Sequence, residues 1–197
     1  MAVGRNYAEH ARELGNDVPQ QPLLFFKPPS AMVGPGEPIV LPEESTRVEY
    51  ESEIGVVLGR RLSHGSEAEA EEAIAGFVCV NDVTARDLQK TDNQWARAKG
   101  FDTFCPVGPR LATGLDWRNL EIIGRVNGVE RQRGHTRDMQ FSIPFLLAYI
   151  SRIMRLEPGD LVATGTPAGT GPLVPGDEVE VEIPGVGILR NPVVSRR

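Results

Sequence analysis

Cysteine is scarce in this sequence, and long apolar runs are absent. Only Cys79 and Cys105 occur among the 197 residues, both in apolar surroundings. The opening MAVGRNYAEH lacks the basic and then apolar layout of a secretory signal, and no apolar run approaches the roughly 20 residues needed to span a bilayer. We therefore expect a soluble protein of the reducing cytoplasm that has no membrane partner.

Basic segments are also missing. The chain carries 21 Lys and Arg against 27 Asp and Glu, a formal net charge of −6, and no basic run is interleaved with aromatic residues. Nucleic acid is therefore not an expected partner. The sequence has no repeat, no low-complexity tract and no Gly/Ser linker, so residues 1–197 are predicted to form a single domain.

The strand and helix patterns of the sequence predict a fold that is mostly β, with a few short helices. Besides the acidic segment described below, strands are predicted at 76–82, 161–165, 177–184 and 187–194. The last two are joined by a Gly-containing hairpin at PGVG. The number of strands and the shortness of the helices together indicate an α+β protein in which sheets form most of the core.

Helix signals occur at four places, namely 5–15, 67–75, 143–154 and a short segment that begins in VTARDLQ. Ser66 and Glu69 form a capping box for the second of these, and Gly76 is its expected stop. Ser142 is the expected N-cap of the third. Thr84 is a possible cap for the helix that begins in VTARDLQ.

VEYESEIGVVLG, from Val48 to Gly59, places three glutamates at alternate positions of a predicted strand. Glu49, Glu51 and Glu53 therefore share one face, and the other face is largely apolar. Carboxylates at this spacing repel each other unless a cation lies between them, and oxygen ligands favour Mg²⁺ or Mn²⁺. Gly55 is expected to leave room beside them. The alternative is an edge strand with a polar, solvated face.

Two further features leave alternatives open. Asp82 ends the predicted strand 76–82, where it reads as an N-cap of the next helix, a role that Thr84 could equally fill. GTPAGTG, residues 165–171, lacks the Gly-Lys-Ser/Thr ending of a phosphate loop. It is either a tight irregular loop or a loop whose backbone N–H groups approach an anionic ligand.

Seven segments in order resemble the fumarylacetoacetate hydrolase superfamily across nearly the whole chain: VGRNYAEHARELG, FFKPPSAMVGPGEPI, YESEIGVVLG, VNDVTARDLQ, AKGFDTFCPVGP, FSIPFLLAYIS and LEPGDLVATGTPAGTGP. The sequence is most similar to the small branch of acylpyruvases, oxaloacetate decarboxylases and 2-hydroxyhepta-2,4-diene-1,7-dioate isomerases. The resemblance implies a mixed β-sandwich roll with short peripheral helices. It also implies one Mg²⁺ or Mn²⁺ at the mouth of the roll.

The resemblance assigns the acidic residues. Glu51, Glu53 and Asp82 match the metal ligands of the family, whereas Glu49 is left out of the ligand set. Lys99 in AKGFD matches an active-site lysine that binds the developing negative charge of the substrate. From the residues alone, Lys99 reads as an ordinary solvated lysine.

The same comparison assigns a base and a set of substrate contacts. His10 and Glu13 lie three positions apart on a predicted helix and match the His-Glu dyad of the family. Without the resemblance they read as an ordinary surface pair. The residues expected to bind substrate are Arg5, Tyr7, Gln89 and Thr166.

These assignments imply a Mg²⁺- or Mn²⁺-dependent enzyme that acts on pyruvoyl-type 2-oxo or 2-hydroxy-dienoic acids. C–C bond hydrolysis or decarboxylation through a stabilised enolate is the first expectation. One alternative is a 2-hydroxyhepta-2,4-diene-1,7-dioate or 5-carboxymethyl-2-hydroxymuconate isomerase of aromatic catabolism. Another is a non-catalytic module that binds a divalent ion or a small acid, but such a module would need neither Lys99 nor the dyad.

One departure from the family concerns the start of the chain. Many relatives carry additional strands before the VGRNY motif, whereas this sequence begins almost at that motif. A first strand before Arg5 would then have little support. The segment that holds His10 and Glu13 is accordingly expected to be mobile, because chain ends are poorly ordered unless they are tied down.

The resemblance also predicts a homodimer, because the roll of the family pairs through an apolar surface that a short chain would otherwise expose. Light scattering at micromolar concentration should give twice the 21.5 kDa mass of the chain. A monomer under these conditions would contradict the prediction.

Overall fold

Strands dominate the structure, a computed structural model that describes residues 1–196. The strands are β1 (Ala2–Gly4), β2 (Leu23–Phe25), β3 (Met32–Val33), β4 (Ile39–Leu41), β5 (Val48–Tyr50), β6 (Ser52–Leu58), β7 (Ile74–Asn81), β8 (Thr84–Ala85), β9 (Cys105–Ala112), β10 (Glu121–Val126), β11 (Val129–His135), β12 (Leu161–Ala163), β13 (Gly171–Pro172), β14 (Glu178–Ile183) and β15 (Gly187–Ser195). The helices are α1 (Ala8–Glu13), α2 (Glu67–Glu72), α3 (Arg86–Thr91), α4 (Ala96–Gly100) and α5 (Ile143–Ile153), with short 3-10 turns at Pro29–Ala31, Trp117–Asn119 and Thr136–Asp138.

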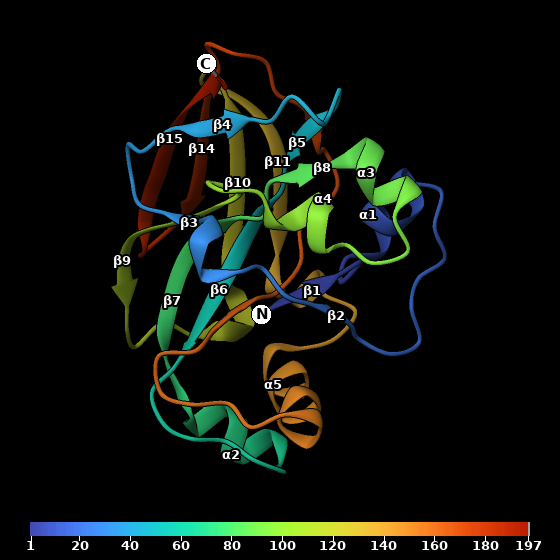
Figure 1. Ribbon diagram of the computed structural model, residues 1–197. Helices are drawn as coiled ribbons and strands as arrows, with labels where there is room; N and C mark the ends of the chain where they lie inside the picture. Colours follow the sequence, from blue (N-terminus) through green and yellow to red (C-terminus); the bar gives the residue numbers. More distant parts are fainter. Residues whose placement is uncertain (197) are drawn as a thin grey trace.

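The strands form three sheets. Seven strands pair in the order β2-β1-β12-β6-β7-β9-β3, five in the order β11-β10-β14-β15-β4, and three in the order β13-β5-β8. Both larger sheets mix parallel and antiparallel pairs. Figure 1 shows β6 and β7 beside β14 and β15, with α2 and α5 together at one end of the molecule. The expected mixed β-sandwich roll with short peripheral helices is confirmed.

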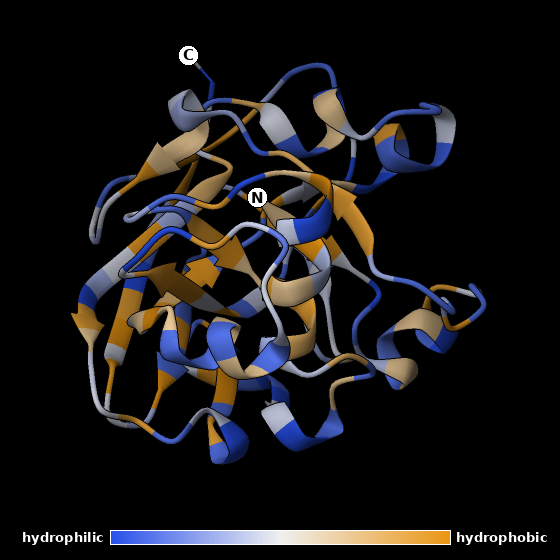
Figure 2. Cartoon of the chain, turned by 90° about the horizontal axis from the view of Figure 1, so that it is seen from below, coloured by the Kyte–Doolittle hydropathy of each residue, from blue (hydrophilic) through white to orange (hydrophobic). Residues whose placement is uncertain are grey.

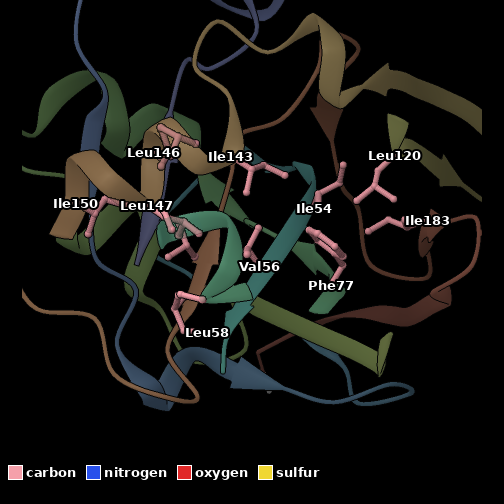
Figure 3. Close-up of a cluster of buried hydrophobic side chains, with 14 of the residues drawn as sticks. Ile54, Val56, Leu58, Phe77, Leu120, Ile143, Leu146, Leu147, Ile150 and Ile183 are labelled. Carbon is pink, nitrogen blue, oxygen red and sulfur yellow. The ribbon is translucent and has the colours of Figure 1, made fainter. Parts of the chain in front are cut away.

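The main core lies between the two larger sheets and beneath α5. Apolar side chains from β6, β7, β10 and β14 meet there, and the inner face of α5 covers one end. Figure 3 shows Ile54 and Phe77 from the first sheet close to Leu120 and Ile183, while Leu146 and Leu147 of α5 lie nearby. Figure 2, coloured by hydropathy, shows that apolar residues are concentrated in the strands of the interior and polar residues in the outer loops.

The longer helices begin where the sequence predicts. The Ser66 hydroxyl accepts from the backbone N–H of Glu69 and the Glu69 side chain reaches back, so the capping box is present. The Ser142 hydroxyl accepts from the N–H of Phe145 at the start of α5. The predicted stop at Gly76 is wrong, since α2 ends at Glu72 and Gly76 lies in β7. A Cβ at Gly76 would meet the carbonyl oxygen of Ala112.

The acidic segment is not one strand. It breaks at Glu51 into β5 and β6, which belong to different sheets. All three glutamates are buried, so neither face is solvated as an edge strand would require. Gly55 does not leave room beside them, because the space where its side chain would lie is filled by Val78 and Val80.

The helix after Asp82 also begins later than predicted. Thr84 lies in the short strand β8, and its hydroxyl donates to the carbonyl oxygen of Asp82 at 2.8 Å. The N-cap of α3 is Ala85, which has no side chain that could cap the helix. Thr84 as a cap is therefore wrong, and Asp82 lies too far before α3 to cap it.

The first strand is better supported than the sequence suggests. β1 lies between β2 and β12, and the helix it leads into is reduced from the predicted 5–15 to α1. Between them, the Asn6 side chain donates to the carbonyl oxygens of Phe141 and Thr164 and accepts from the N–H of Phe141. The segment before the dyad is thus tied into the sheet, so the expectation that the first strand has little support is wrong.

Gly55→Ala should destabilise the fold. The added Cβ would lie 2.5 Å from Val80 and 2.7 Å from Val78, so the β6–β7 pair must shift. Overpacking of this kind costs about 1–3 kcal/mol in the free energy of unfolding, which denaturant titration measures. The matched control is Gly34→Ala, whose Cβ would meet only the flexible Glu37 side chain. Equal losses in the two variants would contradict the packing assigned to Gly55.

Candidate active site

Three carboxylates meet at the junction between β5 and β6. Glu51 lies at the break, Glu53 follows in β6, and Asp82 comes directly after β7, the partner strand of β6. The backbone N–H of Asp82 donates to the carbonyl oxygen of Glu51 at 2.9 Å, which fixes the two segments side by side. One carboxylate oxygen from each residue lies within 4.8 Å of the others, and all three side chains are buried. The donor set suits a hard divalent cation.

Cationic side chains surround two of these carboxylates. Lys99, on α4, donates to Glu51 at 2.7 Å and to Asp82 at 2.5 Å. Lys27, which follows β2, donates to the other Asp82 oxygen at 2.6 Å, and Arg86 donates to Glu51 at 2.6 Å. Lys99 is fully buried between its partners, so it is not the solvated lysine of the alternative reading. The sequence motifs do not single out Lys27 or Arg86.

Glu53 lacks such a partner. Among residues 1–196, its carboxylate accepts one hydrogen bond, at 2.8 Å from the backbone N–H of Gly165. Burial, reinforced by the nearby charges of Asp82 and Glu51, raises the pKa of Glu53 well above its usual value. In contrast, Lys99 and Arg86 overcome the effect of burial on Glu51 and hold its pKa well below the usual range. The uncompensated charge of Glu53 is what a bound cation would neutralise.

Glu49 is buried close to this cluster but takes a different part. Its carboxylate accepts from Arg86 at 2.7 Å and from Arg47 at 2.7 Å. Burial opposes ionisation of Glu49, but these two guanidinium groups lower its pKa. Since Arg86 also bonds Glu51, it joins the two glutamates through one guanidinium group. This geometry agrees with the prediction that leaves Glu49 out of the ligand set.

The predicted dyad lies at the edge of the triad. His10 Nδ1 is 3.4 Å from Glu13 Oε2, and His10 Nε2 is 4.0 Å from Glu51 Oε1. His10 is only 4% exposed. Burial lowers its pKa and outweighs the opposing attraction of Glu51. The imidazole is therefore neutral near pH 7 and able to accept a proton.

A cavity of about 290 Å³ opens beside the dyad and the triad. Its lining includes Arg5, His10, Glu51, Arg86, Gln89, Lys90, Trp95 and Lys99. Arg5 and Gln89, two of the predicted substrate contacts, line this cavity. Arg5 has a positive φ of 57°, an unfavourable conformation for a residue with a side chain. Lys90 and Trp95 also line it, although the sequence motifs do not indicate them.

The other two predicted substrate contacts lie outside that lining. Tyr7 is buried, and its hydroxyl group has no hydrogen-bond partner among the described residues. Thr166 donates to the carbonyl oxygen of Ser52 at 2.9 Å and accepts from the Gln132 amide at 2.8 Å. The hydroxyl group of Thr166 thus ties its loop to β6 and β11. These contacts give it a structural role in place of the predicted contact with substrate.

The backbone N–H groups of the glycine-rich segment 165–171 do approach anions, but not those of a bound ligand. The anions are the protein's own carboxylates. The N–H of Gly165 donates to Glu53, and the N–H of Gly169 donates to both oxygens of Glu13 at 3.1 Å. The loop therefore contacts both the triad and the dyad.

Comparison with known proteins agrees with this geometry. The family model described as fumarylacetoacetate (FAA) hydrolase C-terminal matches residues 1–194. The chain belongs to the fumarylacetoacetate hydrolase family. Over 206 residues it is 43% identical to the mitochondrial oxaloacetate tautomerase FAHD2A of Bos taurus, in an alignment that covers 98% of this chain and 66% of the relative.

Solved structures of the family superimpose closely on this chain. The 5-carboxymethyl-2-hydroxymuconate delta-isomerase from Mycobacterium smegmatis has a TM-score of 0.93 and 46% identity, covering 100% of this chain and 78% of the other. Fumarylpyruvate hydrolase from Pseudomonas aeruginosa, solved in complex with Mn²⁺ and pyruvate, has a TM-score of 0.92 and 34% identity, covering 99% and 88%. The predicted family resemblance is confirmed. Within residues 1–196, no helix is long and apolar enough to cross a membrane.

Glu53→Gln should abolish stabilisation of the protein by Mn²⁺. The change removes one donor of the triad but keeps its shape and its acceptor for the Gly165 N–H. Mn²⁺ at 100 times its dissociation constant should stabilise the unchanged protein by about 2.7 kcal/mol, and the variant by almost nothing. Thermal melting with and without Mn²⁺ measures the difference. Without the ion, the two proteins should melt at similar temperatures. The variant keeps the side-chain shape and the hydrogen bond from Gly165, and it adds no charge to the cluster.

Glu49→Gln is the matched control for this measurement. It removes the same charge from the same segment, but the carboxylate it removes bonds Arg47 and Arg86 and lies outside the triad. The control should melt at a lower temperature and still gain stability from Mn²⁺. An undiminished gain in the Glu53→Gln protein would end the assignment of Glu53 as a metal ligand.

Proposed function

We propose that this protein is a Mg²⁺- or Mn²⁺-dependent enzyme that moves a proton at the carbon beside the oxo group of a small 2-oxo diacid. The reaction is a keto–enol interconversion or the related isomerisation. One observation carries the proposal: a buried, neutral His10 shares a cavity rich in cations with Glu51, the member of the carboxylate triad that lies 4.0 Å from its Nε2.

The triad supports the metal requirement. Its oxygen donors, its burial and the raised pKa of Glu53 all fit a hard divalent cation. When bound, such an ion supplies a Lewis acid that polarises the oxo group and the neighbouring carboxylate of the substrate. Lys99 lines the same cavity and adds a positive charge close to the oxygen that becomes negative.

The cavity supports a substrate with a second acidic group. Of its four cationic side chains, Arg86 and Lys99 are already paired with buried glutamate or aspartate. Arg5 and Lys90 form no ion pair with a carboxylate among residues 1–196, which leaves two positive charges for a ligand. A cavity of about 290 Å³ accommodates a small diacid.

His10 supplies the base. With the Nδ1 proton directed at Glu13, Nε2 is the basic nitrogen on the side of the triad. Nε2 takes the proton from the carbon beside the oxo group, and the C–H electron pair forms the carbon–carbon double bond of the enolate. Returning the proton to oxygen gives the enol, and returning it to a conjugated carbon gives the isomer. Glu13 stabilises the imidazolium that exists in between.

Similarity to named relatives favours proton transfer over the other reactions of the family. The isomerase is 46% identical to this chain and the tautomerase 43%, against 40% for fumarylacetoacetate hydrolase from Exiguobacterium antarcticum and 34% for fumarylpyruvate hydrolase. C–C hydrolysis is the second candidate, because the hydrolase structure has the same fold and holds Mn²⁺ and pyruvate. In that reaction His10 would deprotonate water instead of carbon. We further infer a cytoplasmic location, because the free, buried Cys79 and Cys105 suit a reducing compartment. We also infer that the protein is a homodimer.

His10→Ala should reduce the rate of oxaloacetate keto–enol interconversion on the order of 10²–10⁴-fold, the usual contribution of a positioned base. Metal-dependent decarboxylation of oxaloacetate should fall far less, since carbon dioxide leaves without a base. Glu13→Gln should change both rates in the same direction as His10→Ala, but less, because the base itself remains. Absorbance assays with Mn²⁺, and again with a chelator, measure both reactions, and an acylpyruvate tests hydrolysis.

His64→Ala provides the control, because it also removes an imidazole. His64 lies in an exposed loop, 54 positions after His10 in the sequence. The rates of the His64→Ala protein should match those of the unchanged protein. Equal loss of every activity in His10→Ala and Glu13→Gln would contradict a base and indicate a role in substrate binding. Full interconversion by the His10→Ala protein would refute the proposed mechanism.

A further inference from the structure

The backbone of Gly169 is hydrogen-bonded to two side chains, those of Glu13 and Tyr50. Its N–H donates to Glu13, 3.1 Å from each carboxylate oxygen. Its carbonyl oxygen accepts from the hydroxyl group of Tyr50 at 2.9 Å. Since Glu13 in turn contacts His10, an unbroken line of contacts runs from Tyr50 to the base.

Only glycine fits at position 169. Its φ of 98° lies in the region that side chains disfavour, and a Cβ there would lie 2.1 Å from the carbonyl oxygen of Arg131. The neighbouring Pro167 carbonyl accepts from the Gln132 amide at 2.7 Å, which holds the loop against β11. The backbone N–H of Gly169 therefore has a fixed direction, toward Glu13.

Glu13 needs such a support. It is the last residue of α1, a helix of six residues, and its side chain is 36% exposed. Its separation of 3.4 Å from His10 Nδ1 is too long for a strong hydrogen bond, so this contact alone would orient the carboxylate weakly. The Gly169 N–H adds a second, fixed point of attachment.

Tyr50 is suited to hold the other end. Its side chain is buried in β5, and its hydroxyl group donates to the carbonyl oxygen of Gly169 at 2.9 Å. β5 also pairs with β13, which follows the loop directly, through the register of Tyr50 with Gly171. The loop is thus attached to β5 by both a strand pairing and the Tyr50 side chain.

We propose that Tyr50 and Gly169 are positioning residues for His10, acting through Glu13. This proposal rests on the proposed function, in which His10 is the base. Tyr50 holds the Gly169 carbonyl group, the N–H of the same residue holds the Glu13 carboxylate, and the carboxylate orients the imidazole and stabilises its protonated form. Neither Tyr50 nor Gly169 lines the cavity, so neither is assigned a contact with substrate.

Tyr50→Phe is the sharpest test, because it removes one hydroxyl group and keeps the buried ring. It should lower kcat for oxaloacetate keto–enol interconversion about 3- to 10-fold, the change that the loss of one hydrogen bond produces. KM and the calorimetric affinity for Mn²⁺ should stay within about twofold, since no triad contact is removed. The control is Tyr149→Phe, whose hydroxyl group faces Gln21 at the surface and whose kcat should not change.

A double-mutant cycle separates positioning from general damage to the fold. If Tyr50 acts through Glu13, then Tyr50→Phe should have almost no further effect on kcat in the Glu13→Gln background. Damage to the fold would instead reduce kcat by the same factor in both backgrounds. Circular dichroism and thermal melting check that each variant is folded.

Failure of this proposal can be told apart from failure of the proposed function. If His10→Ala loses interconversion but Tyr50→Phe retains full kcat, the positioning chain is refuted while the base stands. An equal loss from Tyr50→Phe with and without Glu13→Gln also refutes the chain. If His10→Ala retains full activity, the proposed function fails first and this proposal fails with it. Loss in Tyr50→Phe that disappears in the Glu13→Gln background supports it.

Discussion

Electrostatic repulsion among buried carboxylates is the constraint on which this structure depends. Glu49, Glu51, Glu53 and Asp82 are all buried around the junction of β5 and β6. Carboxylates at such distances cannot all remain ionised without compensation. Three segments that are distant in sequence deliver Lys27, Arg86 and Lys99 to three of them. The fourth, Glu53, keeps a raised pKa, and its charge is the one left for a divalent ion.

This division of charge organises the site. Arg86 joins Glu49 to Glu51, and Lys99 joins Glu51 to Asp82, so these three carboxylates are held together without an ion. The break of the acidic segment at Glu51 lets β5 and β6 join different sheets. The seven-stranded and the three-stranded sheets therefore meet at this break. Because the surrounding strands pack into the core, the positions of the three carboxylates are set by the fold itself.

The glycine-rich loop connects the carboxylate cluster with the His10–Glu13 pair. Gly165 donates to Glu53, Gly169 donates to Glu13, and the hydroxyl group of Thr170 lies 3.3 Å from Glu49. A single loop thus contacts Glu53 of the triad, Glu13 of the dyad, and Glu49, which is bonded to Arg47 and Arg86. Its glycines allow the backbone to come close enough for these contacts, which side chains would obstruct.

The sequence by itself determined the family, the mostly β fold, the helix caps at Ser66 and Ser142, and a set of acidic residues that the structure brings together. These features have local signatures, since capping and alternation are set by neighbours a few residues apart. The tertiary structure alone decided that Lys27 reaches Asp82, 55 positions away, and that the glycine-rich loop binds Glu13 and Glu53. It also decided where the acidic segment breaks. Such contacts leave no period or spacing in the sequence, because they depend on which strands pair and not on which residues are adjacent.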